Sequence, residues 1–199
     1  MNDNSENLSP AGAVPPADTG VVVPANNEAP FFDRTDWSSF WLTSGVALAV
    51  YVSTLAPEVT LEFSGISATA ANYAGVGQPP GYPLWTMYAW LFTRILPFSN
   101  IAWRVAVSSA VAGAVACGGI ALMVSRGGAI ILEKLKGFQQ LEPRAARCIR
   151  VACGCVAGMA LGLDGSFWGR AVIVDDWALG LLLLVVVLCL LMRWTHAPQ

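Results

Sequence analysis

Acidic residues beside apolar stretches are the side chains of this sequence that are best suited to chemistry. Asp175 and Asp176 stand together directly before a long apolar run that starts at Trp177. Two adjacent carboxylates at one edge of a membrane span could bind a divalent cation, because hard cations take oxygen ligands. They could equally mark only the start of the span. Glu62 lies in a polar stretch that returns toward apolar sequence, where its carboxylate could act as a general base on an acceptor hydroxyl.

Basic and aromatic residues accompany these acids. Arg94 and Arg104 flank the point at which a short apolar piece gives way to a longer one, and a guanidinium group suits bidentate binding of phosphate. Acids, arginines and aromatics together would suit a lipid-phosphate-linked sugar. Aromatic residues are also enriched at membrane interfaces, so composition does not separate the two interpretations. The aromatic residues in question are Tyr73, Tyr82, Trp85, Trp103, Trp168 and Trp177.

The composition is that of an integral membrane protein. Of the 199 residues, 55% are hydrophobic and 12% are charged, whereas soluble domains carry about 25% charged residues. The net charge of −2 argues against a nucleic-acid-binding surface. The five cysteines lie in or beside apolar segments, and the single histidine, His196, lies near the C-terminus. We therefore expect neither a structural disulfide nor a zinc site.

The apolar pattern predicts an all-α, polytopic membrane helix bundle with about four transmembrane helices. Residues 1–36 read as a disordered tail and residues 37–199 as the membrane domain, with an outer loop over 57–100. The apolar stretch Leu84–Leu96 is too short to cross a bilayer upright, so we expect a re-entrant or interfacial helix there. The predicted spans cover about residues 37–56, 101–124, 149–167 and 177–194.

Basic residues predict the orientation of this bundle. Most of the eleven Lys and Arg residues fall before the first span, around the 125–148 loop or after the fourth span. The positive-inside rule places this set, and with it both chain termini, in the cytoplasm. The set is Arg34, Arg126, Lys134, Lys136, Arg144, Arg147, Arg150 and Arg193.

Small residues recur at helical spacing in two of the predicted spans. Such rows let helices approach closely in lipid, so they predict a tightly packed bundle and not a ligand site. The rows are Gly154, Gly158 and Gly162 in one span, and Ala106, Ala110, Ala114 and Gly118 in the other.

Several sequence blocks resemble a known family. In order, TLAPEVT, GQPPGYPLWT, LPFSNIAWRV and FWGRAVIVDDWALG resemble bacterial protein O-mannosyltransferase-like membrane proteins, the domain of unknown function 2723 type. These proteins belong to the GT-C class of polytopic glycosyltransferases, and the resemblance covers about residues 37–194. It implies a GT-C-like N-terminal architecture, a lipid-linked sugar donor, and an acidic catalytic base in the first outer loop.

The resemblance marks candidate site residues and one departure. It implies a catalytic role for Asp175, which matches an acid of the family, and we add Glu62 as the candidate base. Phe63 stands where the family has an acidic residue, and Glu62 is one position out of register, which on a helix turns a side chain by about 100°. The candidates for substrate binding lie in or beside the matching blocks: Arg104, Tyr82, Trp85 and Trp103.

These observations predict a truncated or degenerate membrane glycosyltransferase-like protein of the bacterial inner membrane. The ancestral activity would transfer a sugar from a polyprenyl-phosphate donor to an acceptor on the outer face. The expected partners are the bilayer, the polyprenyl-phosphate-linked sugar and a downstream C-terminal half, with no nucleic acid. The alternative is a non-catalytic membrane subunit or scaffold, which the departure at Phe63 favours.

Overall fold

The computed structural model describes residues 30–58, 62–77, 81–97, 100–134 and 142–196, and all regular secondary structure within these ranges is helical. This arrangement confirms the predicted all-α class. In chain order the helices are α1 (Arg34–Ser53), α2 (Glu62–Tyr73), α3 (Pro83–Ile95), α4 (Ile101–Lys134), α5 (Pro143–Gly162), α6 (Gly165–Ala171) and α7 (Trp177–Thr195).

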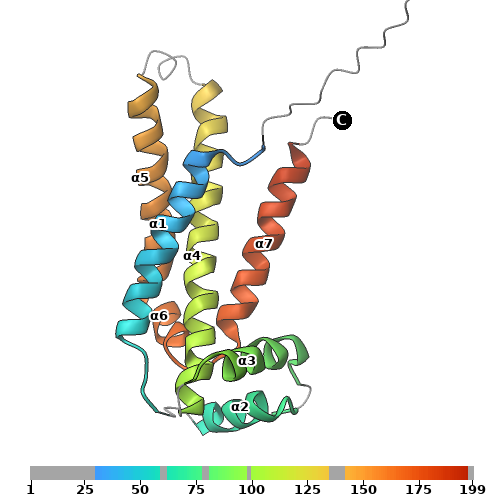
Figure 1. Cartoon of the computed structure of the whole chain (residues 1–199). Helices are drawn as coiled ribbons and strands as arrows, with labels where there is room; N and C mark the ends of the chain where they lie inside the picture. Colours follow the sequence, from blue (N-terminus) through green and yellow to red (C-terminus); the bar gives the residue numbers. More distant parts are fainter. Residues whose placement is uncertain (1–29, 59–61, 78–80, 98–99, 135–141, 197–199) are drawn as a thin grey trace, which may run out of the picture.

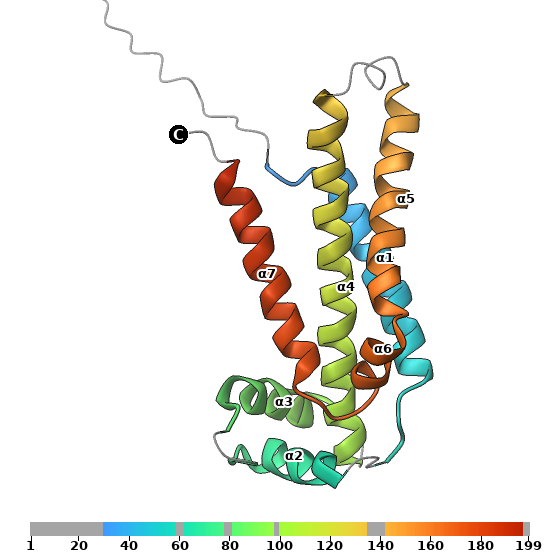
Figure 2. The same cartoon turned by 180° about the vertical axis from the view of Figure 1, so that it is seen from behind.

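The long helix α4 is the centre of the bundle, and α1, α5 and α7 pack around it (Figures 1 and 2). Its buried face is built almost wholly of small residues, which allows the surrounding helices to approach its backbone closely. The predicted small-residue row is therefore confirmed on α4, where Ala106, Ala110 and Ala114 are all buried.

The glycine row on α5 packs closely against the backbone of α4. Gly154, Gly158 and Gly162 are the buried residues of this helix. A Cβ atom added at Gly154 would lie 2.7 Å from the carbonyl oxygen of Ala121, and one added at Gly158 would lie 2.5 Å from that of Cys117. Both distances are too short for a carbon–oxygen contact. The predicted close packing is thus confirmed, and it requires glycine at these positions.

Among the described residues, three helices are long and apolar enough to cross a membrane: α4 over residues 101–132, α5 and α7. They correspond to three of the four predicted spans. The exception is α1, because Asp36 and several serine and threonine residues lower its apolar content. Its membrane crossing stays a prediction. The predicted third span, 149–167, also needs correction, because α5 runs from Pro143 to Gly162 and α6 follows as a separate helix.

Three shorter helices, α2, α3 and α6, gather at one end of the bundle (Figure 1). The predicted helix at Leu84–Leu96 is present as α3, which lies across the end of α4. Pro83 is suited to its first turn, where a missing N–H is no loss. The predicted outer segment 57–100 contains a second helix that the sequence pattern did not predict, α2 over Glu62–Tyr73.

The start of α1 and the end of α7 lie at the opposite end of the bundle (Figures 1 and 2). The end of α4 and the start of α5 lie there too, so the predicted basic segments share one end of the molecule. The assignment of this end to the cytoplasm remains a prediction from the positive-inside rule.

Candidate functional site

Asp175, in the segment before α7, connects α3 and α4 to the start of α7. The backbone carbonyl of Asp175 accepts hydrogen bonds from Trp85 Nε1 of α3 at 3.1 Å and from Ser109 Oγ of α4 at 3.0 Å. These two bonds fix α3 and the start of α7 against α4. One of the predicted substrate-binding residues, Trp85, thus lies directly beside one of the predicted catalytic acids.

The side chain of Asp175 is held by an ion pair. Its Oδ2 lies 3.0 Å from Arg170 Nη1, and its Oδ1 accepts the backbone N–H of Asp176 at 2.8 Å. The Arg170 guanidinium also lies over the ring of Trp177, 4.7 Å from the ring centre. Arg170 is half exposed, with 49% of its side chain accessible. A cation and a carboxylate are therefore presented together at the bundle end.

Asp176 is in a different electrostatic situation from its neighbour. Partial burial raises the pKa of Asp176, and a hydrogen bond with the Asp175 carboxyl raises it further. The nearby Arg170 acts in the opposite direction. Acids whose pKa is shifted by burial and by neighbouring charges are found preferentially at functional sites.

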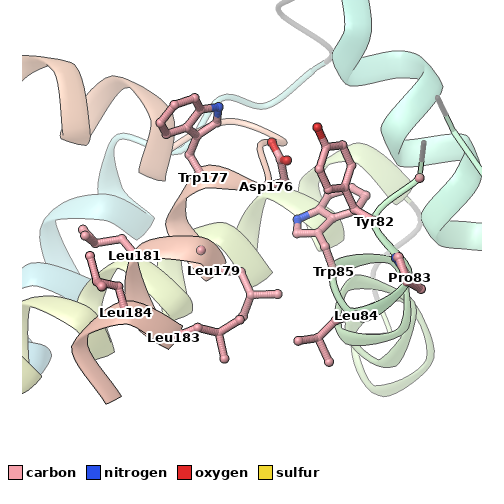
Figure 3. Close-up of a pocket in the computed structure, with 12 residues that line it drawn as sticks. Tyr82, Pro83, Leu84, Trp85, Asp176, Trp177, Leu179, Leu181, Leu183 and Leu184 are labelled. Atoms are coloured by element: carbon pink, nitrogen blue, oxygen red, sulfur yellow. The ribbon is translucent and has the colours of Figure 1, made fainter. Parts of the chain in front are cut away.

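A mostly apolar groove of about 590 Å³ opens beside these acids, between the start of α3 and the first half of α7. Figure 3 shows Tyr82 and Trp85 on one side, leucines of α7 on the other, and Asp176 and Trp177 at one end. Both walls are apolar except at that end. The groove therefore has an amphipathic character that suits a ligand with a polar head and an apolar chain. Its lining comprises Gly81, Tyr82, Pro83, Leu84, Trp85, Asp176, Trp177, Leu179, Gly180, Leu181, Leu183 and Leu184.

Two predicted substrate-binding residues lie elsewhere. Arg104 Nη1 donates to the carbonyl of Thr93 at 2.6 Å, in the last turn of α3 and far along that helix from the groove. Helix ends leave carbonyls without partners, so Arg104 stabilises the end of α3. Trp103 packs against the hydrophobic core. The structure thus brings Tyr82, Trp85, Asp175 and Asp176 together but leaves these two residues outside the group.

The remaining catalytic candidate is Glu62, at the start of α2. Glu62 is the first residue of α2, but its side chain and that of Phe63 lie outside the described residues. Asp164 is a helix cap: its carboxylate accepts the N–H groups of Ser166 and Phe167 at the start of α6. Its role is therefore to stabilise α6.

The divalent cation predicted for Asp175 and Asp176 competes with an existing partner. Arg170 already supplies a positive charge to Asp175, and both of its carboxyl oxygens accept hydrogen bonds. Among the residues that the structure describes, no three His, Cys, Asp or Glu side chains form a group that could hold a metal ion. The arrangement favours the ion pair over a cation, and no step proposed below involves a metal.

Sequence reasoning missed two features. The first is the ion pair of Arg170 with Asp175. The separation of only five residues between the two was the available sign of this pair. The second is a buried charged network at the opposite end of the bundle. There the fully buried Asp36 accepts hydrogen bonds from Ser125 Oγ at 2.6 Å and from Arg150 Nη2 at 2.8 Å. No signal in the sequence connects these residues, since they lie on α1, α4 and α5.

The fold and the groove define a class of protein: a helical membrane protein with an apolar groove that has an acidic residue, Asp176, at one end. The profile of the family described as the protein O-mannosyl-transferase TMEM260 N-terminal domain matches residues 64–199, more than half of the chain. The chain therefore belongs to this family. The matched region contains the entire groove and both acids beside it.

Two curated relatives carry the same name. Protein O-mannosyl-transferase TMEM260 of Mus musculus is 40% identical over 85 residues, which are 40% of this chain and 12% of the mouse protein. The Dictyostelium discoideum protein of that name is 34% identical over 69 residues, 34% of this chain and 8% of the relative. The chain thus aligns with only a small part of either relative. No solved structure matches.

These comparisons refine the family resemblance. They support an O-mannosyltransferase-like membrane family, as the sequence blocks predicted. Both relatives are eukaryotic, so the expectation of a bacterial inner-membrane protein receives no support from them. What they support is the coarser statement that this is a glycosyltransferase-like membrane protein.

Proposed function

We propose that this chain binds a polyprenyl-phosphate-linked sugar and contributes the donor side of a membrane glycosyltransferase site. One observation carries the proposal: the apolar α3–α7 groove ends at Asp176 and Trp177, and these two residues contact the Arg170–Asp175 ion pair. The polyprenyl chain would lie along the α7 leucines. The phosphate would lie near Arg170, a half-exposed cation that contacts Trp177 of the groove lining.

The reaction assigned to such a site is a displacement at the sugar. An acceptor hydroxyl attacks C1, the bond from C1 to the phosphate oxygen breaks, and polyprenyl phosphate leaves with the electron pair. The hydroxyl proton passes to a carboxylate, for which Asp175 and Glu62 are the candidates. Arg170 would offset the charge of the leaving phosphate. The relatives' names suggest mannose as the sugar.

A second candidate function is a non-catalytic membrane subunit, and one observation favours it. The Asp175 carboxylate is already engaged by Arg170 and by the N–H of Asp176, as expected of an acid with a structural role. Phe63 stands where the family that the sequence resembles has an acid, and this also favours the non-catalytic alternative. We expect the 199-residue chain alone to bind donor but to show no sugar transfer.

Donor binding is tested by filling the groove. Gly180 lines it, and a Cβ atom added there meets nothing within 4 Å, so Gly180→Leu adds volume to the groove without a backbone clash. We expect retention of radiolabelled polyprenyl-phosphate mannose by the chain in nanodiscs to fall by about tenfold or more, equivalent to about 1.4 kcal/mol. Gly45→Leu on α1 is the matched control, because that exposed glycine is equally uncrowded. Equal retention by the two variants would refute the groove as the donor site.

The phosphate contact is tested separately by Arg170→Gln. A charge-assisted hydrogen bond contributes about 1.5 kcal/mol at a half-exposed site, so we expect roughly a tenfold weaker donor affinity. Arg94→Gln is the control, because Arg94 lies over Trp90 much as Arg170 lies over Trp177, but at the far end of α3. An unchanged affinity in Arg170→Gln would exclude this arginine from phosphate binding.

Transfer activity distinguishes the two candidate functions. A purified-protein assay would compare the parent with Glu62→Ala, Asp175→Ala and Phe63→Asp on a panel of polyprenyl-phosphate sugars. Turnover by the parent that is lost in Asp175→Ala or Glu62→Ala would make the chain an enzyme and identify its base. Turnover only in Phe63→Asp would identify a degenerate site.

A further inference from the structure

A second groove, of about 780 Å³, lies at the basic end of the bundle between the first halves of α1 and α5. Three arginines, Arg34, Arg144 and Arg147, stand along it. Leu42 and Val151 lie deeper along the same two helices and provide an apolar floor. The groove therefore also combines a charged rim with an apolar floor, but here the rim is cationic.

The rim arginines form no ion pair among the described residues. The ion pairs there are those of Arg126, Arg150 and Arg170. Arg147 donates a hydrogen bond from Nε to the carbonyl of Pro143 at 3.3 Å, within its own helix. Arg34, Arg144 and Arg147 are all exposed.

The nearby acids do not neutralise this rim. The carboxylate of Asp33 faces Arg126 and Arg150, and that of Asp36 faces Arg150 and Ser125. Glu142, directly before α5, is exposed and leaves a clear excess of positive charge. Three cations without ion-pair partners above an apolar floor are complementary to an anionic head carrying an acyl chain.

We propose that the α1–α5 groove binds an anionic phospholipid, with its headgroup phosphate on the arginine rim and one acyl chain on the floor. Basic pockets between transmembrane helices bind such headgroups, and each arginine near a charged membrane surface contributes roughly a fivefold gain in affinity. This site is separate from the α3–α7 groove, because the two lie at opposite ends of the bundle (Figure 1).

The test measures which lipid stays with the purified chain. The chain would be taken from nanodiscs holding equal amounts of phosphatidylglycerol and phosphatidylcholine, and retained lipid would be counted by native mass spectrometry. We expect a preference for phosphatidylglycerol that falls by about 30-fold in Arg144→Gln/Arg147→Gln. Arg94→Gln/Arg193→Gln is the matched control, since it removes the same charge from exposed arginines outside the groove.

A second variant separates a lipid from free phosphate. Ala152 lines the floor and is exposed, so Ala152→Phe fills the place of the acyl chain and leaves the arginines intact. We expect Ala152→Phe to lose phosphatidylglycerol as well. If it retains the lipid while inorganic phosphate displaces that lipid, the site binds phosphate only and the proposal fails.

Two further results would overturn the proposal. One is equal retention of the two lipids by the parent chain. The other is unchanged retention in the double arginine variant. A salt titration of the parent gives a measurement that needs no variant: retention of phosphatidylglycerol should fall steeply with ionic strength. A preference that is insensitive to salt would also count against the arginine rim.

Discussion

Each end of the bundle holds an Asp–Arg ion pair, and the two pairs differ in how accessible they are to solvent. At the α1–α4–α5 end, the Asp36 side chain is fully buried and its partner Arg150 is 14% exposed. At the α3–α7 end, the Asp175 side chain is 16% exposed and its partner Arg170 is 49% exposed. A buried pair has no access to a ligand and joins helices, whereas an accessible pair beside a groove can exchange its partner for a ligand. Accessibility, more than residue type, separates the structural pair from the pair that we propose to be functional.

The largest effect is expected from Asp36→Ala. Removal of this carboxylate leaves the Arg150 guanidinium and the Ser125 hydroxyl without their buried acceptor. Breaking a buried ion pair by removing one partner costs about 3–5 kcal/mol. We expect the thermal unfolding temperature in detergent to fall accordingly. Asp33→Ala is the comparison, because that carboxylate is 44% exposed; loss of its N-cap of α1 and of its exposed ion pairs should cost less, about 1–2 kcal/mol. Similar decreases in unfolding temperature in both variants would contradict the distinction between buried and accessible ion pairs.

A medium loss of stability is expected from Arg104→Ala. This variant tests whether Arg104 has a structural role at the end of α3 that the exposed Arg94 lacks. Arg104 donates to the Thr93 carbonyl, and a hydrogen bond from a charged group contributes about 1.5–3 kcal/mol. Hydrogen exchange of the α3 amides should therefore become faster. Arg94→Ala removes an exposed arginine from the same turn of α3, where stacking on Trp90 contributes about 0.5–1 kcal/mol. Faster exchange in Arg94→Ala than in Arg104→Ala would contradict this assignment.

The smallest expected effect is the contribution of Asp176 to the pH dependence of folding stability. Because its pKa is raised on folding, the folded chain takes up this proton at a higher pH than the unfolded chain does. Stability from this group is therefore gained as the pH falls through the raised pKa toward the ordinary value of 3.8, and is absent at neutral pH. The effect should stay below about 1 kcal/mol, since water screens a partly exposed carboxyl group.

Thermal unfolding of the parent and Asp176→Asn across this pH range measures the effect. The variant should be slightly more stable at neutral pH, and the difference should vanish on acidification. A difference that grows as the pH falls would show that Asp176 is stabilised in its charged form.

Sequence reasoning succeeded where a local rule decides the structure. The glycine row of α5 was predictable because a missing side chain has one steric consequence, which is close approach. The helix at Pro83–Ile95 was predictable because its apolar stretch is too short to cross a membrane. The pairing of Tyr82 and Trp85 with the acids before α7 followed from placing all of them at one membrane face.

The contacts that sequence reasoning missed join residues that are distant in the sequence. Arg104 donates to the Thr93 carbonyl at the end of α3, and no local pattern shows that contact; its binding of phosphate stays a prediction. The Asp36 network joins residues separated by 89 and 114 positions. Helix α2 was missed for another reason: its Gly, Ser, Thr and Asn residues are weak helix formers, and its packing against α3 and α4 overrides that preference.

The buried position of Asp36 has a consequence for the order in which the chain is made. This acid leaves the ribosome long before Ser125 and Arg150 exist, so α1 lacks its counter-charge during early synthesis. An unpaired carboxylate opposes entry into lipid. We therefore predict that α1 integrates late, after α5 has been translated. Nascent chains truncated after α1, α4 or α5 and extracted with alkaline carbonate would reveal the step at which α1 becomes resistant. Resistance of the shortest chain would show that α1 enters the bilayer without its partners.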